Sequence, residues 1–124
     1  MENVAEVVDR YLAGWNERDG ESRDQLIRGV WMEDGRLIDP PAAAAGQSEI
    51  SEMAATLQAQ FPGHRFRRSS AVDEHHNFFR FSWDLVGEDG TVALSGLDVG
   101  EVSDRGAIVR ITGFFGDLTP AELN

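Results

Sequence analysis

The chain has 124 residues, the usual length of one domain and enough to build one sizeable hydrophobic core. It carries 22 acidic and 11 basic residues, a formal charge of -11, so phosphate backbones and anionic membrane surfaces are disfavoured as partners. It has no cysteine and no lysine, which excludes disulfides, thiolate chemistry, Cys-ligated metals and Schiff bases.

The N-terminal residues contain neither the cationic nor the apolar segment of a signal peptide. No apolar run approaches the length of a transmembrane helix. We therefore expect a soluble protein located in the cytoplasm.

The first half of the chain has the apolar periodicity of helices. Residues 2–18 and 50–61 are each predicted to form a long amphipathic helix. Between them, Ser22 followed by Gln25 has the form of a capping box and predicts a short helix. Residues 35–39 are interpreted as a brief strand ended by the prolines that follow, and residues 42–46 as a loop of small residues.

The second half has the composition and punctuation of strands. We expect four of them, over residues 65–72, 76–86, 91–102 and 107–115, with turn signals at Asp89-Gly90 and Asp104-Arg105-Gly106. Helices followed by a four-strand meander predict one α+β domain spanning residues 1–124. Its N-terminal helices should pack on a curved, mostly antiparallel sheet and form a cone around one internal apolar pocket.

Two acidic residues lie where they could carry chemistry. Asp39 ends a predicted strand directly before Pro40, so it is either a general base facing the pocket or the start of an Asp-Pro turn. Asp98 lies in an apolar strand on the same face as Gly96 and Gly100, whose missing side chains would leave room for a ligand. Alternatively, Asp98 is a structural acid satisfied by a neighbouring Tyr, His or Arg.

Several further residues are candidates to surround the pocket. Tyr11 lies on the apolar stripe of the first helix, where a tyrosine is either a core residue or a hydrogen-bond donor. Strand alternation places His75 in phase with a set of aromatic residues that would form one wall, namely Phe79, Phe81 and Trp83. His75 is also the histidine best placed to act as a general acid or base.

No glycine-rich phosphate loop, nucleophile elbow or HExxH motif occurs. A zinc site would need more ligands than three histidines and their neighbours offer. We therefore expect neither a metal nor an organic cofactor.

The order of motifs resembles that of nuclear transport factor 2-like domains. The resemblance rests on the following segments: Tyr11 to Trp15, Leu37-Ile38-Asp39-Pro40, Gly46 opening a helix, Trp83-Asp84-Leu85, Gly96-Leu97-Asp98-Val99, Asp104-Arg105-Gly106 and Gly113-Phe114-Phe115. It covers nearly the whole chain and points to the polyketide cyclase-like and ketosteroid isomerase-like branch.

Ketosteroid isomerase works with an Asp base that faces an oxyanion hole of Tyr and protonated Asp. By resemblance, Asp39 matches the base, while Tyr11 and Asp98 match the two donors. The resemblance also implies a cavity wall that includes Trp15, Leu85 and Phe115, and a homodimer formed through the outer face of the sheet.

The leading hypothesis is a cofactor-independent isomerase or cyclase that acts on a small apolar carbonyl compound. Asp39 would remove a proton α to the carbonyl, and Tyr11 and neutral Asp98 would hydrogen-bond the enolate oxygen. One alternative is a non-catalytic ligand-binding or dimerisation domain. Another is a hydrolase or dehydratase in which Asp39 or His75 activates water and Arg80 orients an acid.

Overall fold

The sheet is built from strands that are not consecutive in the chain. In the computed structural model, which describes residues 3–123, the strand order is β2-β1-β7-β6-β5-β3, and β4 pairs with β5 outside this path. The first strand β1 (Trp31–Asp39) lies parallel to the last strand β7 (Ile108–Phe115), and the other pairs are antiparallel. The sheet is therefore mixed, and its parallel pair joins the two ends of the fold.

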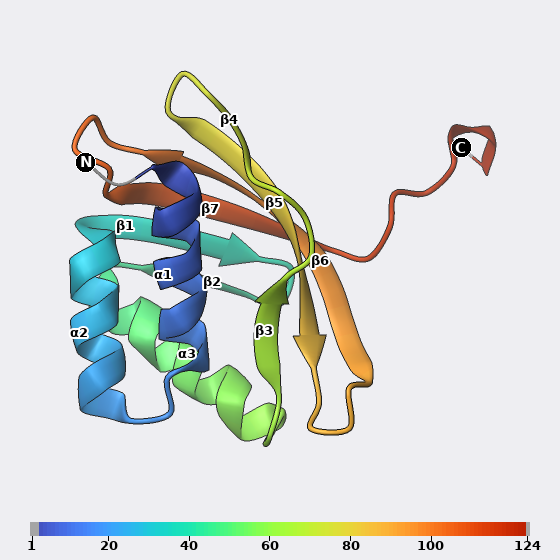
Figure 1. Ribbon diagram of the computed structural model, residues 1–124, viewed down its shortest axis with the longest axis horizontal. Helices are drawn as coiled ribbons and strands as arrows, with labels where there is room; N and C mark the ends of the chain where they lie inside the picture. Colours follow the sequence, from blue (N-terminus) through green and yellow to red (C-terminus); the bar gives the residue numbers. More distant parts are fainter. Residues whose placement is uncertain (1–2, 124) are drawn as a thin grey trace.

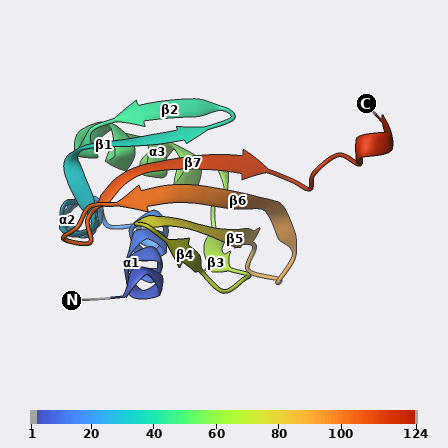
Figure 2. The same cartoon turned by 90° about the horizontal axis from the view of Figure 1, so that it is seen from above.

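Three helices lie along one face of this curved sheet (Figures 1 and 2). They are α1 (Val4–Asn16), α2 (Gly20–Val30) and α3 (Gln47–Gln60). The predicted α+β arrangement is thus confirmed. None of the helices within residues 3–123 combines the length and the apolar character needed to cross a bilayer.

The long central strands agree closely with prediction. β5 (Phe78–Val86) and β6 (Val92–Val102) pair over their whole lengths, and β6 pairs in turn with β7. β3 (Arg65–Arg68) covers only the first half of the strand expected at residues 65–72. After residue 115 the chain leaves the domain and ends in the short 3-10 helix η1 (Ala121–Leu123) (Figure 2).

The core lies between the helices and the inner face of the sheet. Helix α1 buries one stripe of side chains at helical spacing, which includes Val7, Val8, Tyr11 and Trp15. The sheet contributes fully buried residues such as Leu37 and Ile111, which are partners in the parallel β1–β7 pair. This packing holds α1 directly over the strands that carry the candidate site.

Several boundaries differ from the sequence-based expectations. The start expected for the first helix, residue 2, lies outside the described residues, and the helix runs from Val4. Helix α2 begins at Gly20, ahead of the expected capping box, because Asp19 accepts a hydrogen bond from the Ser22 backbone N–H and caps the helix.

Two elements were wrongly interpreted. Residues 42–46 were expected to be a loop, but Ala42–Ala45 forms the edge strand β2 on β1. Residues 76–86 were expected to be one strand, but His76 and Asn77 have φ values of 51° and 69° and form a two-residue hairpin turn. The strand β4 (Asp73–His75) precedes this turn. Positive φ at both central residues is what a tight hairpin of this kind requires.

Candidate active site

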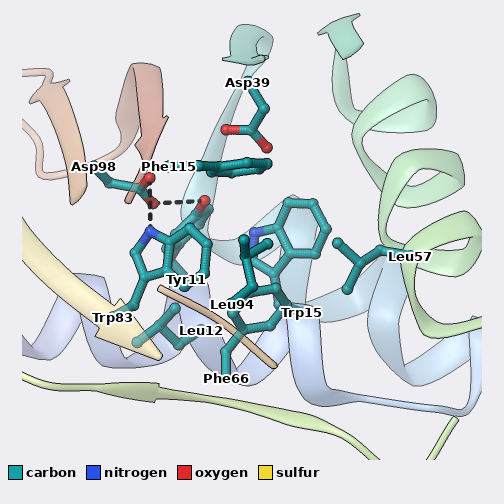
Figure 3. A pocket seen from close by; sticks show the side chains of 10 residues that line it. All are labelled: Tyr11, Leu12, Trp15, Asp39, Leu57, Phe66, Trp83, Leu94, Asp98 and Phe115. Carbon is teal, nitrogen blue, oxygen red and sulfur yellow. Dashed lines mark hydrogen bonds between the residues drawn. The ribbon is translucent and has the colours of Figure 1, made fainter. Parts of the chain in front are cut away.

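A small cavity lies between α1, α3 and the inner face of the sheet (Figure 3). Its volume is about 20 Å³, room for roughly one water molecule or one oxygen atom of a ligand. Aromatic and aliphatic side chains form most of the wall, together with two carboxylates and one phenol. The lining residues are Tyr11, Leu12, Trp15, Asp39, Leu57, Phe66, Trp83, Leu94, Asp98 and Phe115.

Asp98 is held at the cavity by two hydrogen bonds. Its strand β6 turns alternate residues inward, and the Asp98 side chain is only 3% exposed. The Tyr11 hydroxyl donates to Oδ2 over 3.2 Å, and the Trp83 indole N–H donates to Oδ1 over 3.1 Å (Figure 3). Both donors are buried, so Asp98 joins α1, β5 and β6 at one point.

Tyr11 reaches Asp98 because its ring is fixed by aromatic packing. The ring makes edge contacts with Trp15, Trp31 and Phe81 at centroid distances of 6.4, 5.9 and 6.3 Å. Such T-shaped pairs restrict how a ring can tilt. The hydroxyl is therefore directed at the cavity, where Asp98 is its partner.

Asp39 approaches the cavity from another strand. β1 ends at Asp39 because Pro40 and Pro41 cannot continue the ladder, and this places the half-buried carboxylate beside Phe115 (Figure 3). No side chain or backbone N–H within residues 3–123 donates a hydrogen bond to it. Its oxygens are thus free to accept a proton.

Gly113 of β7 lets the two carboxylates come close together. A Cβ atom on Gly113 would overlap Oδ1 of Asp39 and would lie 2.9 Å from Oδ1 of Asp98. Both oxygens therefore lie within 2.9 Å of one point, which puts them within the range of about 4–6 Å over which charged groups shift each other's pKa. Glycine at this position makes the acid pair possible.

Burial perturbs all three groups in the same direction. Loss of solvent raises the pKa of Asp39 to about 6. Loss of solvent, followed by repulsion from Asp39, raises the pKa of Asp98 to about 7, against the lowering effect of the Trp83 and Tyr11 hydrogen bonds. Burial and the nearby acids also raise the pKa of Tyr11 well above its ordinary value. Asp98 is the more deeply buried of the two acids, and burial disfavours its charged form more, so Asp39 is the one that loses its proton first.

Known structures share both this fold and, in one case, much of the sequence. A candidate isomerase of the SnoaL-like family from Agrobacterium tumefaciens strain C58 is 38% identical, with a TM-score of 0.85 over 90% of this chain and 95% of that one. The chain belongs to the SnoaL-like family. Accordingly, it has the nuclear transport factor 2-like fold expected from its motifs.

More distant SnoaL-like and related structures agree in fold alone. A candidate SnoaL-like polyketide cyclase from Jannaschia sp. CCS1 is 18% identical, with a TM-score of 0.73 over 90% of this chain and 84% of that one. A protein with a ketosteroid isomerase-like fold from Catenulispora acidiphila is 13% identical, with a TM-score of 0.71 over 90% and 85%. No protein-family model and no curated protein sequence matches the chain.

Of the residues proposed from the sequence, six line the cavity of this SnoaL-like protein. They are Tyr11, Asp39, Asp98, Trp15, Trp83 and Phe115. Phe79, Phe81 and Leu85 are buried but lie outside the cavity wall, which corrects the expectation for these three. The cavity is small, and Trp83 is the one residue of β5 that lines it. Phe81 packs against Tyr11, and Leu85 pairs with Phe66.

His75 does not reach the site. The hairpin turn at His76 and Asn77 interrupts the strand, so the alternation that placed His75 beside the aromatic residues does not extend to it. Its side chain is exposed on β4, and its ring lies against the neighbouring His76 ring. Arg80 is also exposed and pairs with Asp73 over 3.0 Å.

The space above the inner-strand glycines is filled by protein. A Cβ on Gly96 would overlap the Trp83 ring, and one on Gly100 would overlap the Phe79 ring. The two glycines were expected to leave room for a ligand, but aromatic rings of the protein occupy that room. The glycine that matters for the acids is Gly113, which sequence analysis did not single out, although glycine inside a strand signals a close approach.

An open groove adjoins the cavity. It has a volume of about 480 Å³ and runs between α3 and the segment from Pro41 to Ala44. Cavity and groove share four lining residues, namely Trp15, Asp39, Leu57 and Phe115. Asp39 thus faces both spaces, and a ligand in the groove can present one end to it.

Proposed function

We propose that this SnoaL-like protein is a cofactor-independent enzyme of the isomerase or cyclase type that acts on a small, largely apolar carbonyl compound. One observation carries the proposal: a free carboxylate, a second carboxyl group of higher pKa and a phenol surround one oxygen-sized cavity. A pair of acids whose environments give them different pKa values is the usual arrangement for a base and a neutral donor in one site.

In the proposed reaction, ionised Asp39 takes a proton from the carbon α to the carbonyl. The electrons of that C–H bond move into the carbonyl group, and negative charge develops on its oxygen. When the carbonyl oxygen occupies the cavity, the Tyr11 hydroxyl turns its proton from Asp98 to that oxygen, and neutral Asp98 donates its own proton to the same oxygen. In isomerisation, the enolate takes the proton back from Asp39 at a carbon conjugated with it. In cyclisation, the enolate carbon attacks a second carbonyl carbon of the same molecule, the C=O π electrons move to that oxygen, and the oxygen takes the proton from Asp39.

Each role fits the surroundings of the residue that performs it. Asp39 accepts no hydrogen bond from the described residues that would stabilise its charge, so it remains basic. The Trp83 N–H engages Oδ1 of Asp98 and leaves the proton to Oδ2, the oxygen beside Tyr11. The apolar wall keeps water away from the enolate, where hydrogen bonds are stronger than in water.

The hydrolase alternative lacks the residues that it needs. The exposed positions of His75 and Arg80 remove the second water-activating base and the cation that was to orient an acid. A non-catalytic binding domain remains the rival hypothesis. It would use the same cavity to bind a ligand, but unlike the enzyme it would not catalyse proton transfer.

The test is exchange of α-protons. Small cyclic ketones are incubated with the protein in deuterium oxide, and loss of the α-proton signals is followed by nuclear magnetic resonance. We expect exchange above the rate in buffer, with loss of that excess in Asp39→Asn. The matched control is Asp34→Asn, an exposed acid on the same strand. If wild-type protein exchanges no faster than Asp39→Asn, the binding-domain hypothesis is correct.

A further inference from the structure

The inner cavity is too small to hold a whole substrate. Its roughly 20 Å³ takes one oxygen-sized group, whereas pockets that bind complete small molecules have volumes of about 300–1,000 Å³. The adjoining groove, at about 480 Å³, falls within that range. The two spaces adjoin, since they share four lining residues, and Asp39 is one of these four.

The groove has a definite chemical character. Its apolar lining comes from both sides, from Pro41 and the small residues of β2 on one and from Met53 and Leu57 of α3 on the other. Its charged groups are all acidic: Asp39 at the inner end, with Glu49 and Glu52 on α3. Glu49 is held in place by a 2.9 Å hydrogen bond from the Ala45 backbone N–H.

No basic side chain compensates these acids. Among the described residues that line either the cavity or the groove, none is Arg or His, and the chain has no lysine. A carboxylate or phosphate on a substrate would therefore lose water and meet only like charges, which is the kind of mismatch by which a site rejects a ligand.

We propose that the groove between α3 and β2 is the subsite for the non-reacting part of the substrate, and that this part is apolar and carries no negative charge. The assignment rests on the proposed function for the reacting end. It excludes free acids, phosphate esters and phosphate-bearing thioesters as substrates, and it admits neutral or amine-bearing carbonyl compounds.

Phenols test the assignment, because a phenol oxygen can enter the cavity while a para substituent extends into the groove. The probes are phenol, 4-propylphenol, tyramine and 3-(4-hydroxyphenyl)propionate, and their dissociation constants are measured by calorimetry at pH 7. We expect 4-propylphenol to bind about tenfold more tightly than phenol, since three added carbons are buried. Tyramine should retain most of that gain, and the propionate should bind at least about tenfold more weakly than 4-propylphenol.

Two variants locate the substituent. Thr56→Trp fills the groove and should cancel the gain of 4-propylphenol, whereas Ala59→Trp, at an exposed position of α3 outside the groove, should preserve it. Glu52→Gln should reduce the difference in affinity between 4-propylphenol and the propionate, because it removes one negative charge from the groove. Equal affinity for these two probes in the wild type, or an unchanged gain in Thr56→Trp, would overturn the assignment. Proton exchange tests the proposed function separately, so either idea can fail alone.

Discussion

The Asp39 carboxylate occupies the space that a side chain on Gly113 would need, although Asp39 ends β1 and Gly113 lies within β7. Gly113→Ala should therefore push Asp39 away from Asp98. We expect proton exchange to fall at least about tenfold, and stability to fall by about 1–3 kcal/mol, as for other overpacked sites. Gly29→Ala on the exposed surface of α2 is the control, since a Cβ there meets no atom closer than 3.9 Å. Full activity in Gly113→Ala would show that the closeness of the two acids is not needed.

Stability should depend on pH through Asp98. Its pKa in the folded protein, about 7, lies above the ordinary value of 3.8. The fold thus favours the neutral form, so this contribution to stability is present below about pH 4 and is lost as pH rises through 7. Asp98→Asn cannot ionise, and its loss of stability between pH 5 and pH 8 in urea unfolding should be smaller than that of the wild type. Equal losses would contradict the assigned pKa.

Replacing Asp98 by an apolar side chain should destabilise the protein. Asp98→Leu leaves the Tyr11 hydroxyl and the Trp83 N–H without their buried acceptor. Each orphaned donor costs about 1–3 kcal/mol. We expect a lower melting temperature for Asp98→Leu than for Asp98→Asn at every pH, measured by circular dichroism.

The pH dependence of catalysis should be bell-shaped. The active form has Asp39 ionised and Asp98 neutral, so kcat/KM should rise as pH passes about 6 and fall as pH passes about 7. In Asp98→Asn the amide remains a neutral donor, so the fall at high pH should disappear while the rise remains. An unchanged alkaline limb in this variant would mean that another group is responsible for it.

Trp83 should set the position of the alkaline limb. Its N–H bond to Oδ1 lowers the pKa of Asp98 by stabilising the charged form. Trp83→Phe should therefore move the limb to higher pH, in addition to any loss of stability. Trp31→Phe, another buried tryptophan that packs against Tyr11, makes no such bond and should leave the limb in place. Identical pH profiles for the two variants would reduce Trp83 to a packing role.

The exposed residues His75 and Arg80 should be dispensable for activity. His75→Ala and Arg80→Ala should each change kcat/KM less than about twofold, because neither side chain faces the cavity. A large loss in either variant would revive the hydrolase alternative.

The fold could be predicted because its signals are periodic and repeated. The spacing of Val7, Tyr11 and Trp15 determines which face of α1 is buried, and the alternation around Asp98 correctly turned it inward. Individual strand limits depended on local turn geometry. The positive φ values at His76 and Asn77 cannot be derived from alternation, and they moved His75 out of the site.

The polar centre of the site was only partly predictable, for a related reason. Asp39, Tyr11 and Asp98 were found from their segments, but the fold brings them together through contacts between distant residues. Gly113 opposes Asp98 in the β6–β7 ladder, but Asp39 comes beside Gly113 only because β1 pairs with β7, and the sequence does not reveal that pairing. A tyrosine was among the partners expected for Asp98, and Tyr11 is one, but the second partner, Trp83 on β5, had been expected only as part of the aromatic wall.

The parallel pairing of β1 with β7 has a consequence for how the protein is made. Leu37 pairs with Ile111, and β7 separates the strand of Asp39 from that of Asp98. During synthesis, β1 can pair with β2 early, but its other neighbour, β7, is made only when the ribosome reaches residues 108–115. Contacts between residues so far apart in sequence form late and slowly. The base and the acid therefore meet only after β7 has been synthesised, and a nascent protein halted before residue 108 carries both groups but no site.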